Sequence, residues 1–114
     1  MPYIETKTNL TLTEKQKREF KEELGKAIEA IPGKSEQWLM LGFNDGMTMA
    51  FRGDAEAPTA MIEVALFGSA DQSAYDALTE ILCDRASKIL GVPSARIYVK
   101  YTEHERWGFN GFNF

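Results

Sequence analysis

The chain has 114 residues, of which 44% are hydrophobic, and a formal net charge of −4 at pH 7. This length predicts one domain, residues 1–114, with a core of modest size. The acidic balance argues against a nucleic-acid partner, because such proteins present clustered Lys and Arg to the phosphates. A single cysteine, Cys83, and a single histidine, His104, are too few for a disulfide, a zinc cluster or a Ser-His-Asp arrangement. We therefore expect neither a metal nor a cofactor.

The N-terminal segment has no secretory pattern, since it reaches charge already at Glu5. No window approaches the roughly 18 to 20 apolar residues that a membrane span needs. The expected location is the cytoplasm, without a membrane partner, while secretion by a route without a signal peptide stays open.

The first half of the chain predicts a strand, a helix and a second strand. Residues 3–8 alternate and include β-branched side chains, as strands do. Thr13 and Gln16 have capping-box spacing, which predicts a helix from there to about Ala30. The apolar run 38–43 predicts a strand buried on both faces, and 47–51 a short returning strand. The expected buried face of the helix consists of Phe20, Leu24, Ala27, Ile28 and Ile31.

The second half repeats this order. Residues 60–67 predict a long strand, and a second helix follows, with Ser73 and Asp76 at capping-box spacing. Residues 91–93 end that helix, and the alternation over 96–102 predicts a fourth strand. The buried face expected for the second helix consists of Tyr75, Leu78, Ile81, Leu82, Ile89 and Leu90.

Two strand–helix–strand units with right-handed crossovers predict an α+β (α/β) fold of two β-α-β repeats. The expected architecture is a four-stranded sheet with both helices on one face. The strand residues look too apolar to leave the other face in water, and no third helix remains to cover it. Self-association through that face is the simplest solution.

Pro2 is the first candidate for chemistry. Removal of Met1 would expose a secondary amine, and burial and a nearby lysine would both lower the pKa of that amine toward the range of a general base. Lys34 follows the first helix, where an ammonium can hold a substrate carboxylate or polarise a carbonyl. Each residue also has an ordinary explanation: Met-Pro can simply start a chain, and a lysine after a helix complements the helix dipole.

Other candidates are less distinctive. The tail 107–114 is dense in aromatic residues and glycine, and it either closes an aromatic pocket or seals a subunit interface. Tyr98 lies on the last expected strand, where a tyrosine usually packs. His104, between two glutamates, is expected in a solvated loop, and Cys83 as a packed thiol within the second helix.

Taken together, these motifs resemble the macrophage migration inhibitory factor family and its microbial members. The resemblance rests on Pro2, on Pro-Gly-Lys at 32–34, on Arg-Ile-Tyr-Val-Lys-Tyr at 96–101 and on Trp-Gly-Phe-Asn-Gly-Phe-Asn-Phe at 107–114. It covers the whole chain and includes Met-Ala-Phe-Arg-Gly at 49–53. Each motif alone is weak, but their order and spacing together are specific.

This resemblance implies a homotrimer in which three sheets form a barrel wrapped by helices, with active sites between neighbouring subunits. It implies that Pro2 is the catalytic acid and base for keto–enol exchange in a small enol or keto acid such as phenylpyruvate, or in a dopachrome-type substrate. Lys34 and the backbone N–H of Leu66 are then the donors to the substrate carboxylate. The residues expected to line the substrate site are Trp38, Phe109 and Phe114 as aromatic walls, with Tyr98 and Lys100.

The sequence also departs from the family in three places. Lys100 stands where the animal cytokine has an asparagine, which puts the preferred ring substituent in doubt. Trp38 replaces a tyrosine, so the wall is kept but a hydroxyl is lost. The CxxC motif of the cytokine is missing, because residues 58–61 read Pro-Thr-Ala-Met. Thiol oxidoreductase activity linked to that motif is therefore not expected.

Three functions are compatible with these features. The first is a cofactor-independent tautomerase, an isomerase that acts on arylpyruvates. The alternative is a cytokine-like signalling protein that binds a receptor and has a vestigial pocket, which rests on kinship alone. The third is a structural trimer without a ligand.

Overall fold

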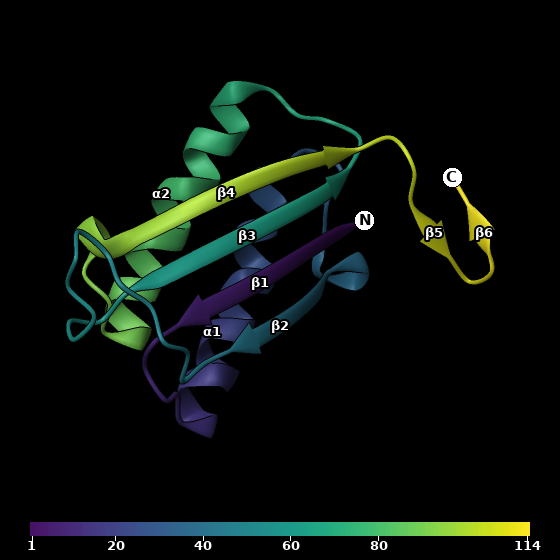
Figure 1. Ribbon diagram of the computed structural model, residues 1–114. Helices are drawn as coiled ribbons and strands as arrows, with labels where there is room; N and C mark the ends of the chain where they lie inside the picture. Colours follow the sequence, from purple (N-terminus) through teal and green to yellow (C-terminus); the bar gives the residue numbers. More distant parts are fainter.

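The computed structural model describes all 114 residues and contains two α-helices and six strands (Figure 1). Short 3₁₀ turns cover Ile28–Ala30, Glu36–Trp38 and Ser94–Arg96. In chain order the elements are β1 (Pro2–Thr8), α1 (Glu14–Ala27), β2 (Met40–Asn44), β3 (Ala60–Phe67), α2 (Gln72–Leu90), β4 (Ile97–His104), β5 (Gly108–Phe109) and β6 (Phe112–Asn113).

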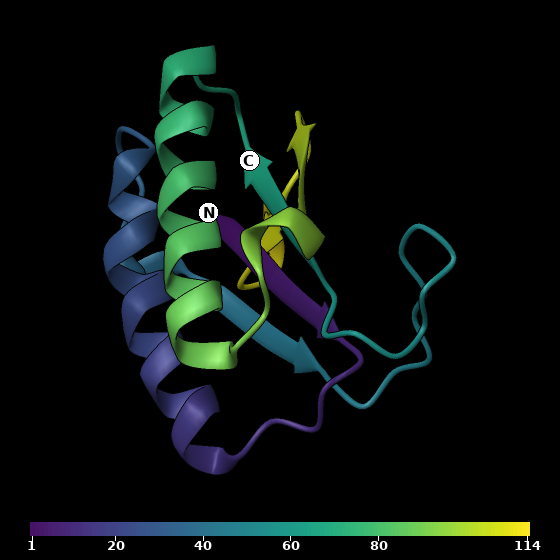
Figure 2. The same cartoon turned by 90° about the vertical axis from the view of Figure 1, so that its left-hand side faces the viewer.

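The four long strands form one sheet in the order β2-β1-β3-β4. The pairs β1–β2 and β3–β4 are parallel, each joined through a helix, and β1 runs antiparallel to β3 at the centre. Figure 2 shows both helices on the same face of the sheet. The predicted α+β fold of two β-α-β repeats is confirmed. Neither helix is both long enough and apolar enough to cross a membrane.

The core lies between the helices and one sheet face. Alternate residues of β1 and β3 are buried there, among them Ile4, Ile62 and Val64. The five residues predicted for the buried face of the first helix are all buried. On α2, Leu78, Leu82 and Leu90 are buried as predicted, with Ala86. Ile81 is 36% exposed, so its predicted burial is wrong.

Helix boundaries follow local signals closely in α1 and less so in α2. The capping box of Thr13 and Gln16 is present with both hydrogen bonds, while the last predicted turn of the helix is a 3₁₀ turn. The capping box expected at Ser73 is wrong: α2 already begins at Gln72, with Asp71 at the N-cap position and no side-chain cap. Gly91 ends α2 at φ 77°, a left-handed conformation that glycine adopts without strain.

Two strand predictions around residues 38–51 are wrong. Trp38 belongs to a 3₁₀ turn, and β2 starts only at Met40. This strand is an edge of the sheet rather than a strand buried on both faces, and Met40 is 69% exposed. The returning strand at 47–51 does not form; a loop with one isolated bridge between Phe51 and Asp54 replaces it.

The sheet face away from the helices is charged at its centre. The Glu63 carboxylate forms ion pairs with Lys7 Nζ, at 2.8 Å, and with Lys100 Nζ, at 2.6 Å. These lysines, Lys100 first, lower the pKa of the Glu63 carboxyl. The expectation that this face is too apolar for water is therefore wrong at its centre, because three adjacent strands place compensating charges there.

The aromatic tail folds as a separate small hairpin, β5–β6, beyond the end of β4 (Figure 1). Its turn contains Asn110 at φ 51° and Gly111 at φ 84°. Two successive positive φ values are the backbone of the tight turn that suits a two-residue hairpin. The hairpin lies beyond the end of the sheet at which β3 and β4 end and β1 begins (Figure 1).

Candidate active site

The largest cavity of the chain, about 940 Å³, lies where β1 begins and β4 ends. Most of its lining is hydrophobic, as in typical small-molecule sites. The lining consists of Met1, Pro2 and Tyr3 of the N-terminal strand, Gln37, Trp38, Leu39 and Met40 before and in β2, Ala65 of β3, His104 of β4, and Trp107, Gly108 and Phe109 of the tail.

Two of the three predicted wall residues line this cavity. The rings of Trp38 and Phe109 meet edge to face, with centroids 5.5 Å apart. Phe114 does not line the cavity; its ring stacks on Phe109 at 6.5 Å and contacts Phe67 at 5.6 Å. It therefore supports the wall from behind. The C-terminal tail thus forms part of the cavity wall, which agrees with the prediction that it closes an aromatic pocket.

The N-terminal amine of Met1 and the ammonium of Lys34 are neighbours. Burial, first, and then a hydrogen bond and the positive charge of Lys34 lower the pKa of the Met1 amine from 8.0 to about 6. Lys34 Nζ is held in place by donating to the Phe67 carbonyl at 2.9 Å. The start of β1 is thus an environment in which an amine is largely unprotonated at neutral pH.

The backbone donor beside this amine belongs to Phe67. The Phe67 N–H donates to the Met1 carbonyl at 3.0 Å, and the next N–H, of Gly68, donates to His104 on β4. Because successive N–H groups of a strand point in opposite directions, the N–H of Leu66 also points toward β4. Leu66 pairs with Pro2 in the sheet and is fully buried. The geometry thus favours the N–H of Phe67, rather than the predicted N–H of Leu66, as the backbone donor to a substrate carboxylate.

Tyr98 and Lys100 lie away from this cavity within the chain. Tyr98 pairs with Met61, six residues before Phe67 on β3, a separation of about 20 Å at the usual strand rise. It is 63% exposed and packs edge to face on Phe51 at 5.2 Å. Lys100 is bound to Glu63 on the open face. A role of either residue in the cavity requires a second copy of the chain.

His104 is a lining residue that the sequence did not reveal. The predicted loop is wrong, because β4 continues two residues beyond Thr102 and ends at His104, but the predicted exposure to solvent is confirmed. His104 lines the cavity that also contains Met1 and Pro2, and it borders a smaller hollow with Phe67 and Glu105. Extending the strand alternation from Tyr98 and Lys100 by two steps would have placed His104 on the same face.

No cluster of His, Cys, Asp and Glu in the chain has the arrangement of a metal site.

Comparison with known proteins agrees with this architecture. A family model described as Macrophage migration inhibitory factor (MIF) matches residues 1–114. The chain therefore belongs to the macrophage migration inhibitory factor family.

Individual relatives match most or all of the chain at modest identity. The macrophage migration inhibitory factor of Xenopus laevis is 27% identical over 94 residues, which cover 81% of each chain. The crystal structure of Leishmania major MIF2 superposes with a TM-score of 0.93 at 29% identity, covering 100% of this chain and 97% of that one. The Toxoplasma gondii factor gives a TM-score of 0.90 at 26% identity, covering 98% and 99%.

Proposed function

We propose that this protein is a cofactor-independent keto–enol tautomerase in which the amine of Pro2, exposed by removal of Met1, carries the proton. The observation behind this proposal is the low pKa, about 6, of the amine at the start of β1, beside Lys34 and inside an aromatic cavity. A general base works best when its pKa lies near the working pH. That amine belongs to Met1; Pro2 follows it, is buried and lines the same cavity, so burial and the nearby charge of Lys34 should lower the pKa of the Pro2 amine as well.

The reaction needs only one proton carrier. In the enol-to-keto direction, the Pro2 amine accepts the hydroxyl proton of the enol, and the resulting ammonium returns a proton to the adjacent carbon. The product is an isomer of the substrate, so no oxidant, water or metal enters the balance. An aryl side chain such as that of phenylpyruvate suits the walls formed by Trp38 and Phe109.

Two cationic or polar donors suit the acid end of such a substrate. Lys34 Nζ lies beside the amine and is oriented by the Phe67 carbonyl. The Phe67 N–H currently donates to Met1, so removal of Met1 frees it for a substrate oxygen. A charged donor and a backbone donor together stabilise the negative charge that develops on an enolate.

We further propose that the protein works as a homotrimer, as the family resemblance implies. Within one chain Tyr98 is largely exposed and distant from Pro2, and β2 and β4 are open sheet edges. Association that covers these edges would bring Tyr98 of a neighbouring copy toward the cavity. Light scattering should then give about three times the 12.8 kDa of one chain, and a monomer mass would contradict the assembly.

The central test combines intact mass with turnover. Protein with a verified Pro2 terminus should interconvert enol and keto phenylpyruvate, and Pro2→Gly should lower the rate by orders of magnitude. As a matched control, an alanine inserted between Met1 and Pro2 converts the proline nitrogen into an amide and should abolish turnover while preserving the oligomer. Absence of tautomerisation with every arylpyruvate and dopachrome-type substrate, at a verified Pro2 terminus, contradicts the proposal.

A further inference from the structure

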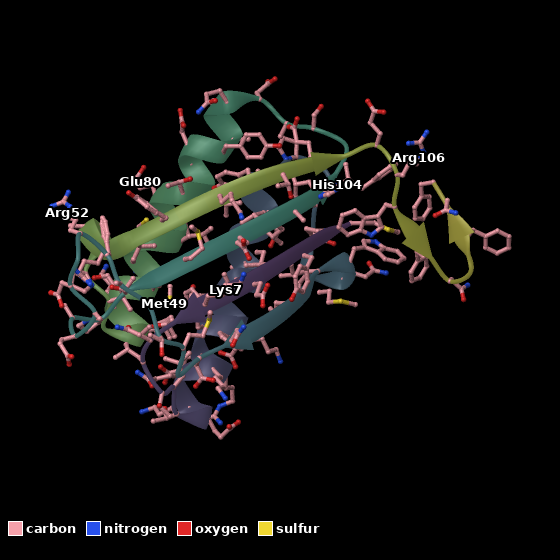
Figure 3. All side chains as sticks on the ribbon, in the orientation of Figure 1. Lys7, Met49, Arg52, Glu80, His104 and Arg106 are labelled. Atoms are coloured by element: carbon pink, nitrogen blue, oxygen red, sulfur yellow. The ribbon has the colours of Figure 1, made fainter.

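His104 is a polar side chain of the cavity that the proposed reaction leaves unused. It is the last residue of β4 and pairs in register with Phe67, whose carbonyl orients Lys34. Figure 3 shows it at the end of the strand, beside the point where the chain turns toward the hairpin. It therefore shares the cavity with the amine end of β1.

The imidazole is held in place by two contacts that leave one nitrogen available. Its Nε2 lies 3.1 Å from the Thr102 hydroxyl, and its ring meets Trp107 edge to face at 5.7 Å. Nδ1 has no hydrogen bond within the chain. Once protonated, the ring has a donor on each nitrogen, so one N–H can bind a ligand while the other keeps its contact with Thr102.

The charges around the ring leave it without a counter-ion. The other titratable groups that line the cavity are the Met1 amine and Tyr3, and Lys34 is hydrogen-bonded to the carbonyl of Phe67, the residue paired with His104. The neighbouring Glu103 accepts the Tyr75 hydroxyl at 2.5 Å and the Ala70 N–H at 3.3 Å. The other neighbour, Glu105, is exposed. No ion pair of the chain includes His104.

We propose that His104 is a specificity-determining residue: its protonated imidazole binds the anionic group of a ligand in this cavity and favours carboxylic acids over their uncharged esters. The inference builds on the proposed function for the ligand class, an oxo acid, but binding itself requires no turnover. Charge-assisted hydrogen bonds are about twice as strong as neutral ones. Only the protonated imidazole carries a positive charge, so the proposal predicts tighter binding of the acid, but not of the ester, where the ring is protonated.

The only histidine of the chain gives a direct readout, since its C2–H resonance in a proton NMR spectrum has no competitor. The probe is 3-phenylpropionate, a carboxylate that cannot tautomerise, with its methyl ester as the uncharged match. The acid should move the midpoint of the His104 titration to higher pH, and the ester should not. A midpoint that saturating acid leaves unchanged overturns the inference.

Binding measured by calorimetry separates His104 from other charges. Affinity for the acid should fall roughly three- to tenfold between pH 5.5 and pH 8, while that for the ester stays constant. His104→Gln, which keeps a partner for Thr102, should clearly reduce the loss of acid affinity between pH 5.5 and pH 8. The pH dependence that this variant keeps is that of the N-terminal amine in the same cavity, whose pKa lies in the same range. Arg106→Gln removes an exposed cation that points away from the sheet (Figure 3) and should preserve the wild-type pH dependence.

The two proposals fail in different measurements. Wild-type pH dependence of acid binding in His104→Gln overturns the role of His104, even if the protein is an active tautomerase. Missing turnover in the wild type contradicts the proposed function, even if His104 still responds to the acid.

Discussion

Replacing Lys34 by methionine tests whether Lys34 helps to lower the pKa of the N-terminal amine. Lys34 contributes to the fall in the pKa of the Met1 amine from 8.0 to about 6, although burial contributes more and remains in the variant. If the substitution raises the pKa of the catalytic Pro2 amine by about one unit, the unprotonated fraction falls about tenfold at pH values well below that pKa and hardly changes well above it. The rate should follow the same pattern, with a loss of up to about tenfold on the acid side.

The assay is kcat/KM for tautomerisation as a function of pH, measured with the methyl ester of an arylpyruvate. An ester has no carboxylate for Lys34 to bind, so a change in rate reports the pKa of the amine and not the loss of substrate binding by Lys34. The unprotonated amine is the active form, so the rate rises with pH through the pKa of the Pro2 amine, and the variant should shift this acid limb to higher pH. An acid limb that does not move, at any reduction in rate, refutes the electrostatic role of Lys34.

Three further predictions concern stability. Leu82→Ala should cost about 2–5 kcal/mol of unfolding free energy in denaturant titration, because Leu82 is fully buried between the helices and the sheet. Thr13→Ala removes the N-cap acceptor of Gln16 N–H and should cost about 1 kcal/mol in the same assay, whereas loss of more than about 3 kcal/mol would indicate another role. The pKa of Glu63 is lowered in the fold, so its stabilisation is complete above its unfolded pKa of about 4.5 and declines as pH falls below it. Glu63→Gln should flatten this acid decline in thermal unfolding curves, and an unchanged slope would exclude Glu63 as its source.

The parts of the fold that the sequence predicted well are those with a clear local pattern. Residues 60–67 are apolar except for Glu63, and β3 has these same bounds and buries every second residue. The run 38–43 misled, because an apolar run does not say how many neighbours a strand has. It belongs to an edge, where only β1 pairs with it, and its first residues form a 3₁₀ turn.

The site divides in the same way. Pro2, Lys34, Trp38 and Phe109 lie at one end of the sheet, a grouping that the family resemblance implied. Tyr98 depends on how copies assemble, which no single-chain pattern encodes. His104 was missed because its exposure, which the two flanking glutamates correctly suggested, was taken to mean a loop. The strand continues to His104 and brings this exposed residue to the rim of the cavity.

Both chain ends lie at the cavity: Met1 lines it, and Phe114 packs on the ring of Phe109 that forms its wall. The position of an affinity tag therefore affects any test of the proposed activity. An affinity tag fused before Met1 would leave the proline nitrogen acylated, and one fused after Phe114 would load a hairpin held to the domain largely by ring contacts.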